Sequence, residues 1–121
     1  MKLYAEAQAG ALHVQVHDER IDAAVAIRFK DKMREIALQP SDRVVLDLSR
    51  VTFVDSSGLG AIVAVMKALA PARRLELAGL TPNVAKVFRL TRMDSVFTIH
   101  SAAETTAIVP AAAAVAARHG D

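Results

Sequence analysis

Apolar and polar residues alternate near the start of the chain. Leu12, Val14 and Val16 are each followed by a polar residue, which is the period of a half-buried strand with one solvated face. The preceding residues 8–11 predict a turn from an earlier strand over residues 3–7. We therefore expect the chain to open with a β-hairpin.

Helices and strands alternate after this hairpin. Apolar residues at helical spacing predict a helix over residues 23–38, with Asp22 as its N-cap and Pro40 as its stop. Residues 44–48 are almost continuously apolar, which is typical of a central strand covered on both faces. The further elements expected are a helix that follows Gly58 and ends near Leu69, a strand over residues 75–78, a helix that begins at Thr81 and Pro82, and a strand over residues 96–99. This order predicts the α/β class, with a single mixed β-sheet of about four to five strands and helices packed mainly on one face.

The last part of the chain has a different composition. Ser101 and Glu104 form a capping box, which predicts a helix toward Val109. From Pro110 the chain is alanine-rich, and this segment is either a helical extension or a frayed end. We expect one domain over residues 1–109 and a tail over residues 110–121.

The composition narrows the function classes. The chain has 121 residues, enough for one ordinary domain, and it has no cysteine for a disulfide framework or a thiolate metal site. The net charge is only +2, aromatic residues are few, and basic residues 28–34 are interpreted as the solvated face of a helix, so we expect no nucleic-acid binding. The longest apolar run, residues 58–66, is too short for membrane insertion, and the first residues do not form a signal peptide. These patterns predict a cytoplasmic protein.

Small polar residues lie between an apolar stretch and an apolar helix. Asp55, Ser56 and Ser57 are expected at the N-terminus of that helix, where unpaired N–H groups and a partial positive charge favour a carboxylate or a phosphate. A phosphate on Ser56 would add about −1.5 to −2 charges, which would be costly to bury against a partner that had fitted a neutral hydroxyl. Modification of Ser56 would in this way control an interface and leave the domain folded.

The helix after this turn has two apolar faces. Leu59 belongs to the face with the spacing of a core. The other face carries Ala61, Ala64, Val65 and Ala68, and it is either an exposed docking patch beside Ser56 or a surface covered by another helix.

Three other kinds of site fit these residues poorly. The nucleophile elbow of serine hydrolases, Gly-x-Ser-x-Gly, is absent around Ser56. His13 and His17 lie on the same side of a strand but roughly 13 Å apart, so one metal ion cannot bridge them. Gly58-Leu59-Gly60 lacks the third glycine of a dinucleotide-binding loop. We expect no metal, no cofactor and no enzymatic activity.

Two segments form a signature together, Val45-Leu46-Asp47-Leu48 and Val51-Thr52-Phe53-Val54-Asp55-Ser56-Ser57-Gly58-Leu59-Gly60. They resemble the core of the STAS domain family, and the likeness spans about residues 3–109. The resemblance implies the STAS fold and, specifically, a bacterial anti-sigma factor antagonist, which is a phosphoprotein of transcription regulation.

By motif position in that family, Ser56 is the serine that an anti-sigma factor serine kinase phosphorylates. The resemblance implies partner switching: the unphosphorylated protein binds the kinase and releases a sigma factor, phosphorylation abolishes binding, and a phosphoserine phosphatase restores it. Asp22 matches an acidic residue near the partner interface, while Asp55 and Ser57 flank the acceptor. The predicted partner-binding residues are Asp22, Asp55, Ser56, Ser57, Gly58, Leu59, Ala61 and Val65.

Two residues depart from the family pattern, because Glu19 and Arg92 stand where many relatives have glycine. A left-handed backbone at Arg92 would cost on the order of 1 kcal/mol relative to glycine. Other STAS roles stay open, namely a subunit of a lipid ABC transporter or a stress-signalling scaffold, and the competing class is a small-ligand or nucleotide binder. The expected oligomeric state is a monomer or weak dimer.

Overall fold

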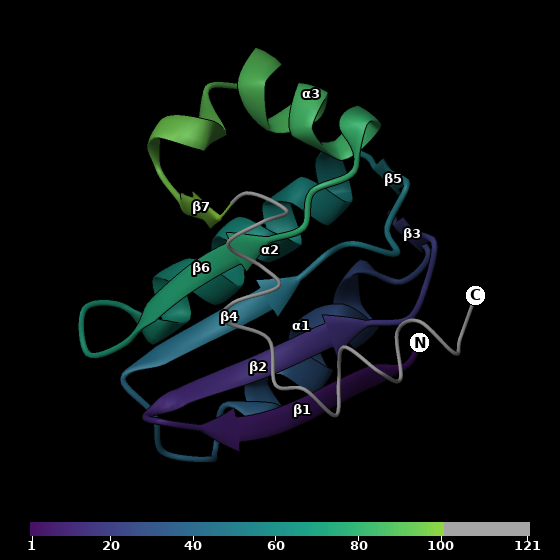
Figure 1. The fold of residues 1–121 in the computed structure, drawn as a ribbon. Coiled ribbons are helices and arrows are strands. Elements are labelled where there is room, and N and C mark those ends of the chain that lie inside the picture. The colour runs from purple at the N-terminus through teal and green to yellow at the C-terminus, as the bar shows by residue number, and fades with distance from the viewer. Residues whose placement is uncertain (101–121) are drawn as a thin grey trace.

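The protein contains one five-stranded mixed sheet with the strand order β1-β2-β4-β6-β7 (Figure 1). A computed structural model describes residues 1–100. The strands are β1 (Leu3–Gln8), β2 (Ala11–Val16), β4 (Arg43–Asp47), β6 (Arg74–Ala78) and β7 (Thr98–His100). The first pair, β1 and β2, is antiparallel, and every later pair in this sheet is parallel. The predicted hairpin and the central position of β4 are both confirmed.

Within residues 1–100, three α-helices alternate with the strands, as the α/β pattern predicts. They are α1 (Ala26–Ile36), α2 (Ser56–Leu69) and α3 (Pro82–Leu90), and the short 3-10 helix η1 (Met93–Ser95) follows α3. The first two pack against each other on one face of the sheet, behind it in Figure 1, and α3 lies at the end of the sheet near β5 (Phe53–Val54). The arrangement confirms a mixed sheet with helices mainly on one face.

A second, very small ladder joins two loops and was not predicted as a pair. Strand β3 (Arg20–Ile21) runs parallel to β5 (Phe53–Val54). The Glu19 carbonyl oxygen extends the contact, because it accepts hydrogen bonds from the backbone N–H groups of Thr52 (2.8 Å) and Phe53 (3.2 Å). This ladder places the start of α2 beside the entry to α1.

Several element boundaries differ from the sequence prediction. Helix α1 ends at Ile36 rather than at residue 38, and α2 begins at Ser56 rather than after Gly58. Helix α1 begins at Ala26 rather than at residue 23, since residues 23–25 form a turn and the N-cap position is Val25, which makes no side-chain capping bond. The last strand begins at Thr98 rather than at residue 96, because η1 occupies the preceding residues. The helix predicted from Ser101 and the tail over residues 110–121 lie outside the described residues.

The core lies between the sheet and helices α1 and α2. Leu12, Val14 and Val16 are fully buried there, as the alternation predicts. The opposite side of β2 is not simply solvated, because Gln15 is only 7% exposed and its Nε2 donates to Asp47 Oδ2 over 3.5 Å. The prediction of a solvated face is therefore wrong at Gln15, where polar side chains of adjacent strands cover one another.

The same sheet face contains a buried carboxylate. Glu76 is 3% exposed and accepts two hydrogen bonds from Arg43, both of 2.8 Å. Its Oε1 also lies 2.6 Å from His100 Nε2. The Arg43 hydrogen bonds are the main cause that lowers the pKa of Glu76 to about 2, so this carboxylate stays charged at neutral pH.

Candidate functional site

Asp55 fixes the N-terminus of α2. Its backbone is extended, as an N-cap residue requires, and its Oδ1 accepts a hydrogen bond of 2.8 Å from the Gly58 N–H. Ser56 is therefore the first residue of the helix, and both Ser56 and Ser57 are exposed. This confirms that the predicted polar cluster lies at a helix N-terminus.

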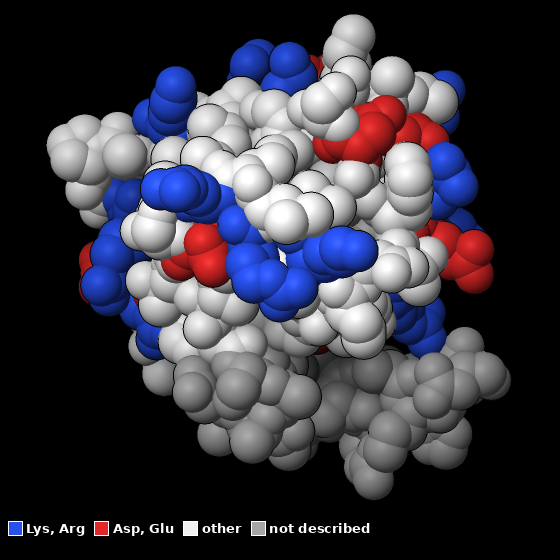
Figure 2. All heavy atoms as spheres, turned by 90° about the horizontal axis from the view of Figure 1, so that it is seen from above, with Lys and Arg blue, Asp and Glu red and all other residues white. Residues whose placement is uncertain are grey.

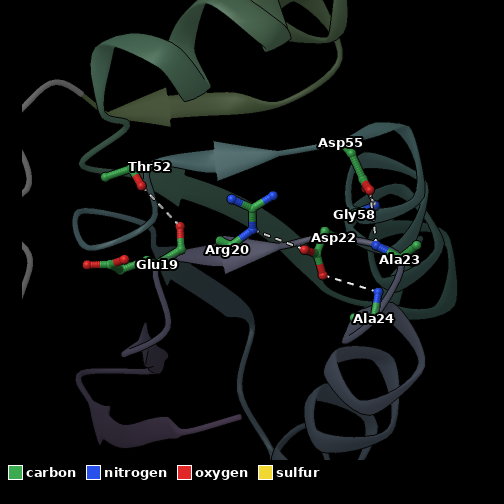
Figure 3. A network of polar contacts seen from close by, with 8 residues as sticks. All are labelled: Glu19, Arg20, Asp22, Ala23, Ala24, Thr52, Asp55 and Gly58. Carbon is green, nitrogen blue, oxygen red and sulfur yellow. Dashed lines mark hydrogen bonds and ion pairs between the residues drawn. The ribbon is translucent and has the colours of Figure 1, made fainter.

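The second oxygen of Asp55 joins two elements that are distant in sequence. Asp55 Oδ2 accepts a hydrogen bond of 3.1 Å from the Ala23 N–H, in the turn that precedes α1 (Figure 3). The Gly58 N–H is the main cause that lowers the pKa of Asp55, with further contributions from the Ala23 N–H and the charge of Arg20. Asp55 is thus a charged link between the start of α2 and the entry to α1.

Asp22 holds the same turn from the other side. Its Oδ1 accepts from the Ala24 N–H and its Oδ2 from Arg20 Nε, each over 3.1 Å (Figure 3). The Arg20 guanidinium lies over the Phe53 ring, 4.2 Å from its centroid. The prediction of Asp22 as a helix N-cap is wrong, because its carboxylate closes a turn four residues before the first residue of the helix, Ala26, and the N-cap position is Val25.

Gly58 is the point of closest contact between α2 and β3. A Cβ atom added at Gly58 would lie 1.8 Å from the carbonyl oxygen of Ile21, so only glycine fits. A Cβ added at Gly60 would meet no atom within 4 Å. The first glycine of the motif therefore serves packing of the helix on the ladder, and the second has no such role within the described residues.

The second apolar face of α2, for which a docking patch and a covered surface were the two alternatives, is only partly exposed. Ala61 and Val65 are 3% and 7% exposed and belong to the hydrophobic core, since α1 packs against α2. Of the two alternatives for this face, an exposed patch or a surface covered by another helix, the second therefore holds at these two residues, and their role in partner binding stays a prediction. Ala64 and Ala68 are exposed, and Leu59 is half-buried.

Charged residues are unevenly distributed near this end of the molecule. Figure 2 shows Lys and Arg side chains gathered near the middle of the face seen from above, with Asp and Glu in separate clusters. Helix α3 and the turn after it provide exposed Lys86, Arg89 and Arg92 to this end. Arg92 has φ 60° and ψ 19°, which confirms the left-handed backbone considered for this position, whereas Glu19 forms its loop without a positive φ.

The described residues contain no group of three or more His, Asp or Glu side chains that could hold a metal ion. His17 Nδ1 lies 3.1 Å from Arg50 Nη1, and its Nε2 lies 2.6 Å from Gln15 Oε1. His13 and His17 both have a lowered pKa, chiefly because of burial. In the part of the chain described, no helix is both long and apolar enough to cross a bilayer.

Sequence comparison finds relatives of similar size. BtrV of Bordetella bronchiseptica is 36% identical over 66 residues, which are 54% of this chain and 57% of BtrV, so the match spans less than two thirds of that protein. The anti-sigma-B factor antagonist of Listeria monocytogenes is 29% identical over 80 residues, which are 65% of this chain and 70% of that protein.

Solved structures share the fold. An anti-sigma factor antagonist from Mycobacterium paratuberculosis superposes with a TM-score of 0.73 at 23% identity, over 82% of this chain and 84% of that one. SpoIIAA of Bacillus in its phosphorylated form gives a TM-score of 0.64 at 23% identity, over 88% of this chain and 96% of that one. The family model of the STAS domain matches residues 3–106. The chain therefore belongs to the STAS domain family.

Proposed function

We propose that this protein is an anti-sigma factor antagonist that binds an anti-sigma factor through the start of α2, and that phosphorylation of Ser56 abolishes the binding. The observation that carries the proposal is the exposed position of Ser56 as the first residue of α2. The names of the Listeria and Mycobacterium relatives and the existence of SpoIIAA in a phosphorylated form support the same function.

The Ser56 side chain is free to be modified without loss of an internal contact. Within residues 1–100 its hydroxyl takes part in no hydrogen bond, whereas the neighbouring Asp55 uses both carboxylate oxygens for the fold. A phosphate at the first helical position also interacts favourably with the partial positive charge there, typically by about 0.3–1 kcal/mol. Phosphorylation is therefore expected to leave the domain folded.

The same modification would change the surface that a partner meets. A phosphate adds about −1.5 to −2 charges and strongly hydrated oxygens, directly beside the Asp55 carboxylate. A partner surface that had fitted the neutral hydroxyl would have to desolvate this charge or stay apart. The expected loss of binding therefore arises at the interface and requires no change in the fold of the domain.

The proposed interface consists of Asp22, Asp55, Ser56, Ser57 and Leu59. Gly58 is buried, and it acts by setting the distance between α2 and β3 rather than by touching a partner. In the complete cycle, an anti-sigma factor with serine kinase activity would modify Ser56, and a phosphoserine phosphatase would return the protein to its binding form.

The test combines modification and binding. The protein is incubated with an anti-sigma factor kinase and ATP, and the modified residue is located by mass spectrometry. Ser56→Ala should bind and escape modification. Ser56→Asp should bind at least about tenfold more weakly, which corresponds to about 1.4 kcal/mol.

Two variants serve as controls. Gln39→Glu adds one negative charge at an exposed position beyond the other end of α1, and it should bind like the wild type. Ser57→Ala should still be phosphorylated. If Ser56→Asp and Gln39→Glu bound the anti-sigma factor equally well, a charge switch at Ser56 would be refuted. Stable copurification with a transporter ATPase, unchanged by Ser56→Asp, would indicate a different STAS role.

A further inference from the structure

Helices α1 and α2 leave a groove between them on the outer surface of the domain. Its volume is about 380 Å³, within the usual range of binding pockets. Met33 and Val65, both buried, form part of its base, and the exposed Ala64 and Ala68 line it from α2. Apolar surface is thus open to solvent in a concave form.

The rim of the groove is cationic. Lys30 and Arg34 line it from α1, and neither forms an ion pair within the described residues. Arg73 lies at one end, where its guanidinium donates to the carbonyl oxygens of Gln39 and Ser41, both over 2.8 Å. The acidic residues of α1, Asp31 and Glu35, do not line the groove. Lys30 and Arg34 therefore border the apolar surface with no partner of opposite charge among residues 1–100.

The dimensions of the groove match a helix. The lining residues run over 30–37 on α1 and its C-cap, which at 1.5 Å per residue is roughly 10 Å, or about two helical turns. On the other side they run over 64–69 on α2, and Ala72 and Arg73 continue the lining after that helix ends. Apolar anchors at positions i, i+3, i+4 and i+7 of a docked helix span about the same length. Lys30 and Arg34 are one turn apart, the spacing at which acidic residues i and i+4 lie on one face of a partner helix.

We propose that this groove binds an acidic amphipathic helix of a partner protein. The apolar side chains of that helix enter the groove, and its carboxylates pair with Lys30 and Arg34. A single acyl chain with one anionic headgroup would pair with only one of the two cations. A second copy of this chain docked through the same groove would bring two sets of cations together.

This surface is separate from the predicted phosphorylation site. Ala64 follows Ser56 by eight residues, or roughly 12 Å along α2. The inference does not rest on the proposed function, and binding in the groove is expected to be the same for Ser56→Asp and for the wild type. One helix would then provide a regulated surface at its start and an unregulated one along its second half.

The probe is a 14-residue acetylated and amidated peptide with leucine at the helical anchor positions and glutamate elsewhere. A matched peptide carries lysine in place of each glutamate. Fluorescence anisotropy with the full chain should show at least about tenfold tighter binding of the acidic peptide, and added salt should weaken that binding because the paired charges are exposed.

Charge reversal distinguishes the groove from general electrostatic attraction. The double variant Lys30→Glu/Arg34→Glu should lose the acidic peptide and gain the basic one. The matched control Arg28→Glu/Lys32→Glu makes the same change in charge on the same helix, at residues that do not line the groove, and should keep the wild-type preference. Ala68→Trp, which fills the groove, should abolish binding of the acidic peptide.

Several outcomes would overturn the proposal. Equal effects of the two charge-reversal variants would mean that net charge, not the groove, attracts the peptide. Binding of dodecanoate in the groove without binding of the acidic peptide would identify a small amphiphile as the occupant. Concentration-dependent self-association that Ala68→Trp abolishes would identify a second copy of the chain.

Discussion

The two glycines of the motif offer a matched test of how α2 is held. A Cβ at Gly58 would lie 1.8 Å from the Ile21 carbonyl oxygen and 2.7 Å from its carbon, whereas a Cβ at Gly60 would meet nothing within 4 Å. Both residues are inside α2, so Gly→Ala gives each the same gain in helix propensity, about 1 kcal/mol. Any difference between the two variants in the free energy of unfolding therefore comes from the contact of α2 with β3.

The size of the difference follows from the geometry. To relieve the clash in Gly58→Ala, α2 and β3 must move apart by more than about 1 Å, and a backbone carbonyl cannot rotate aside as a side chain does. Overpacking of this kind costs typically 1–3 kcal/mol, and here more, because the β3–β5 ladder moves as well. We expect Gly60→Ala to be more stable than the wild type by about 0.5–1 kcal/mol and Gly58→Ala to be less stable by about 2 kcal/mol.

The assay is urea unfolding followed by circular dichroism at 222 nm, because the chain has no tryptophan. The two variants should differ by about 3 kcal/mol in the free energy of unfolding, or roughly 10 °C or more in Tm for a domain of this size. Equal stability of Gly58→Ala and Gly60→Ala would show that the close approach of α2 to β3 is not a constraint on the fold.

Three further predictions concern stability. The pKa of Glu76 falls from 4.5 to about 2 on folding, so this carboxylate stabilises the protein above pH 4.5 and loses that effect as the pH falls toward 2. In urea titrations, the free energy of unfolding of the wild type should fall by about 2 kcal/mol more than that of Glu76→Gln between pH 6 and pH 3. Parallel pH profiles of the two proteins would refute this. Arg73→Ala removes the donors to the carbonyl oxygens of Gln39 and Ser41, and it should lower the free energy of unfolding by about 2 kcal/mol. Hydrogen exchange of the backbone amides after α1 should become faster, and unchanged exchange would contradict the role of the guanidinium. Arg92→Gly should raise the free energy of unfolding by about 0.5–1 kcal/mol, because φ at this position is 60°. The control Arg89→Gly removes the same charge inside α3 and should lower the free energy of unfolding by about 1 kcal/mol. A loss of stability in both variants would exclude backbone strain at Arg92.

The periodicity of apolar residues in the sequence was sufficient to predict most strands of the sheet. The alternation around Leu12 and the continuous apolar run over residues 44–48 each reflect the faces of a strand that are covered, and burial of this kind acts on every residue of the element. The start of α1 could not be predicted in the same way. A two-residue ladder between Ile21 and Val54 draws the chain into β3, and it leaves no local pattern because the paired residues are 33 positions apart.

The candidate site was predictable where its chemistry is local. Asp55 caps the helix that it precedes, so the motif itself indicates the position of Ser56 at the helix start. The bond from the Ala23 N–H to Asp55 and the burial of Ala61 depend instead on how α1 meets α2, which only the packed structure determines. Small apolar residues on a helix give no sequence signal that separates a helix–helix contact from an exposed docking surface.

The low pKa of Asp55 has a consequence for the proposed switch. Two neighbouring anions often reduce their repulsion when one of them takes up a proton, which would weaken any effect of phosphorylation. The Gly58 and Ala23 N–H groups hold Asp55 in its charged form, and both bonds belong to the framework that joins α2 to the turn before α1. Proton uptake at Asp55 would therefore weaken the fold at this junction. A phosphate on Ser56 would for this reason keep a charged neighbour at neutral pH, and a partner would meet the full added charge.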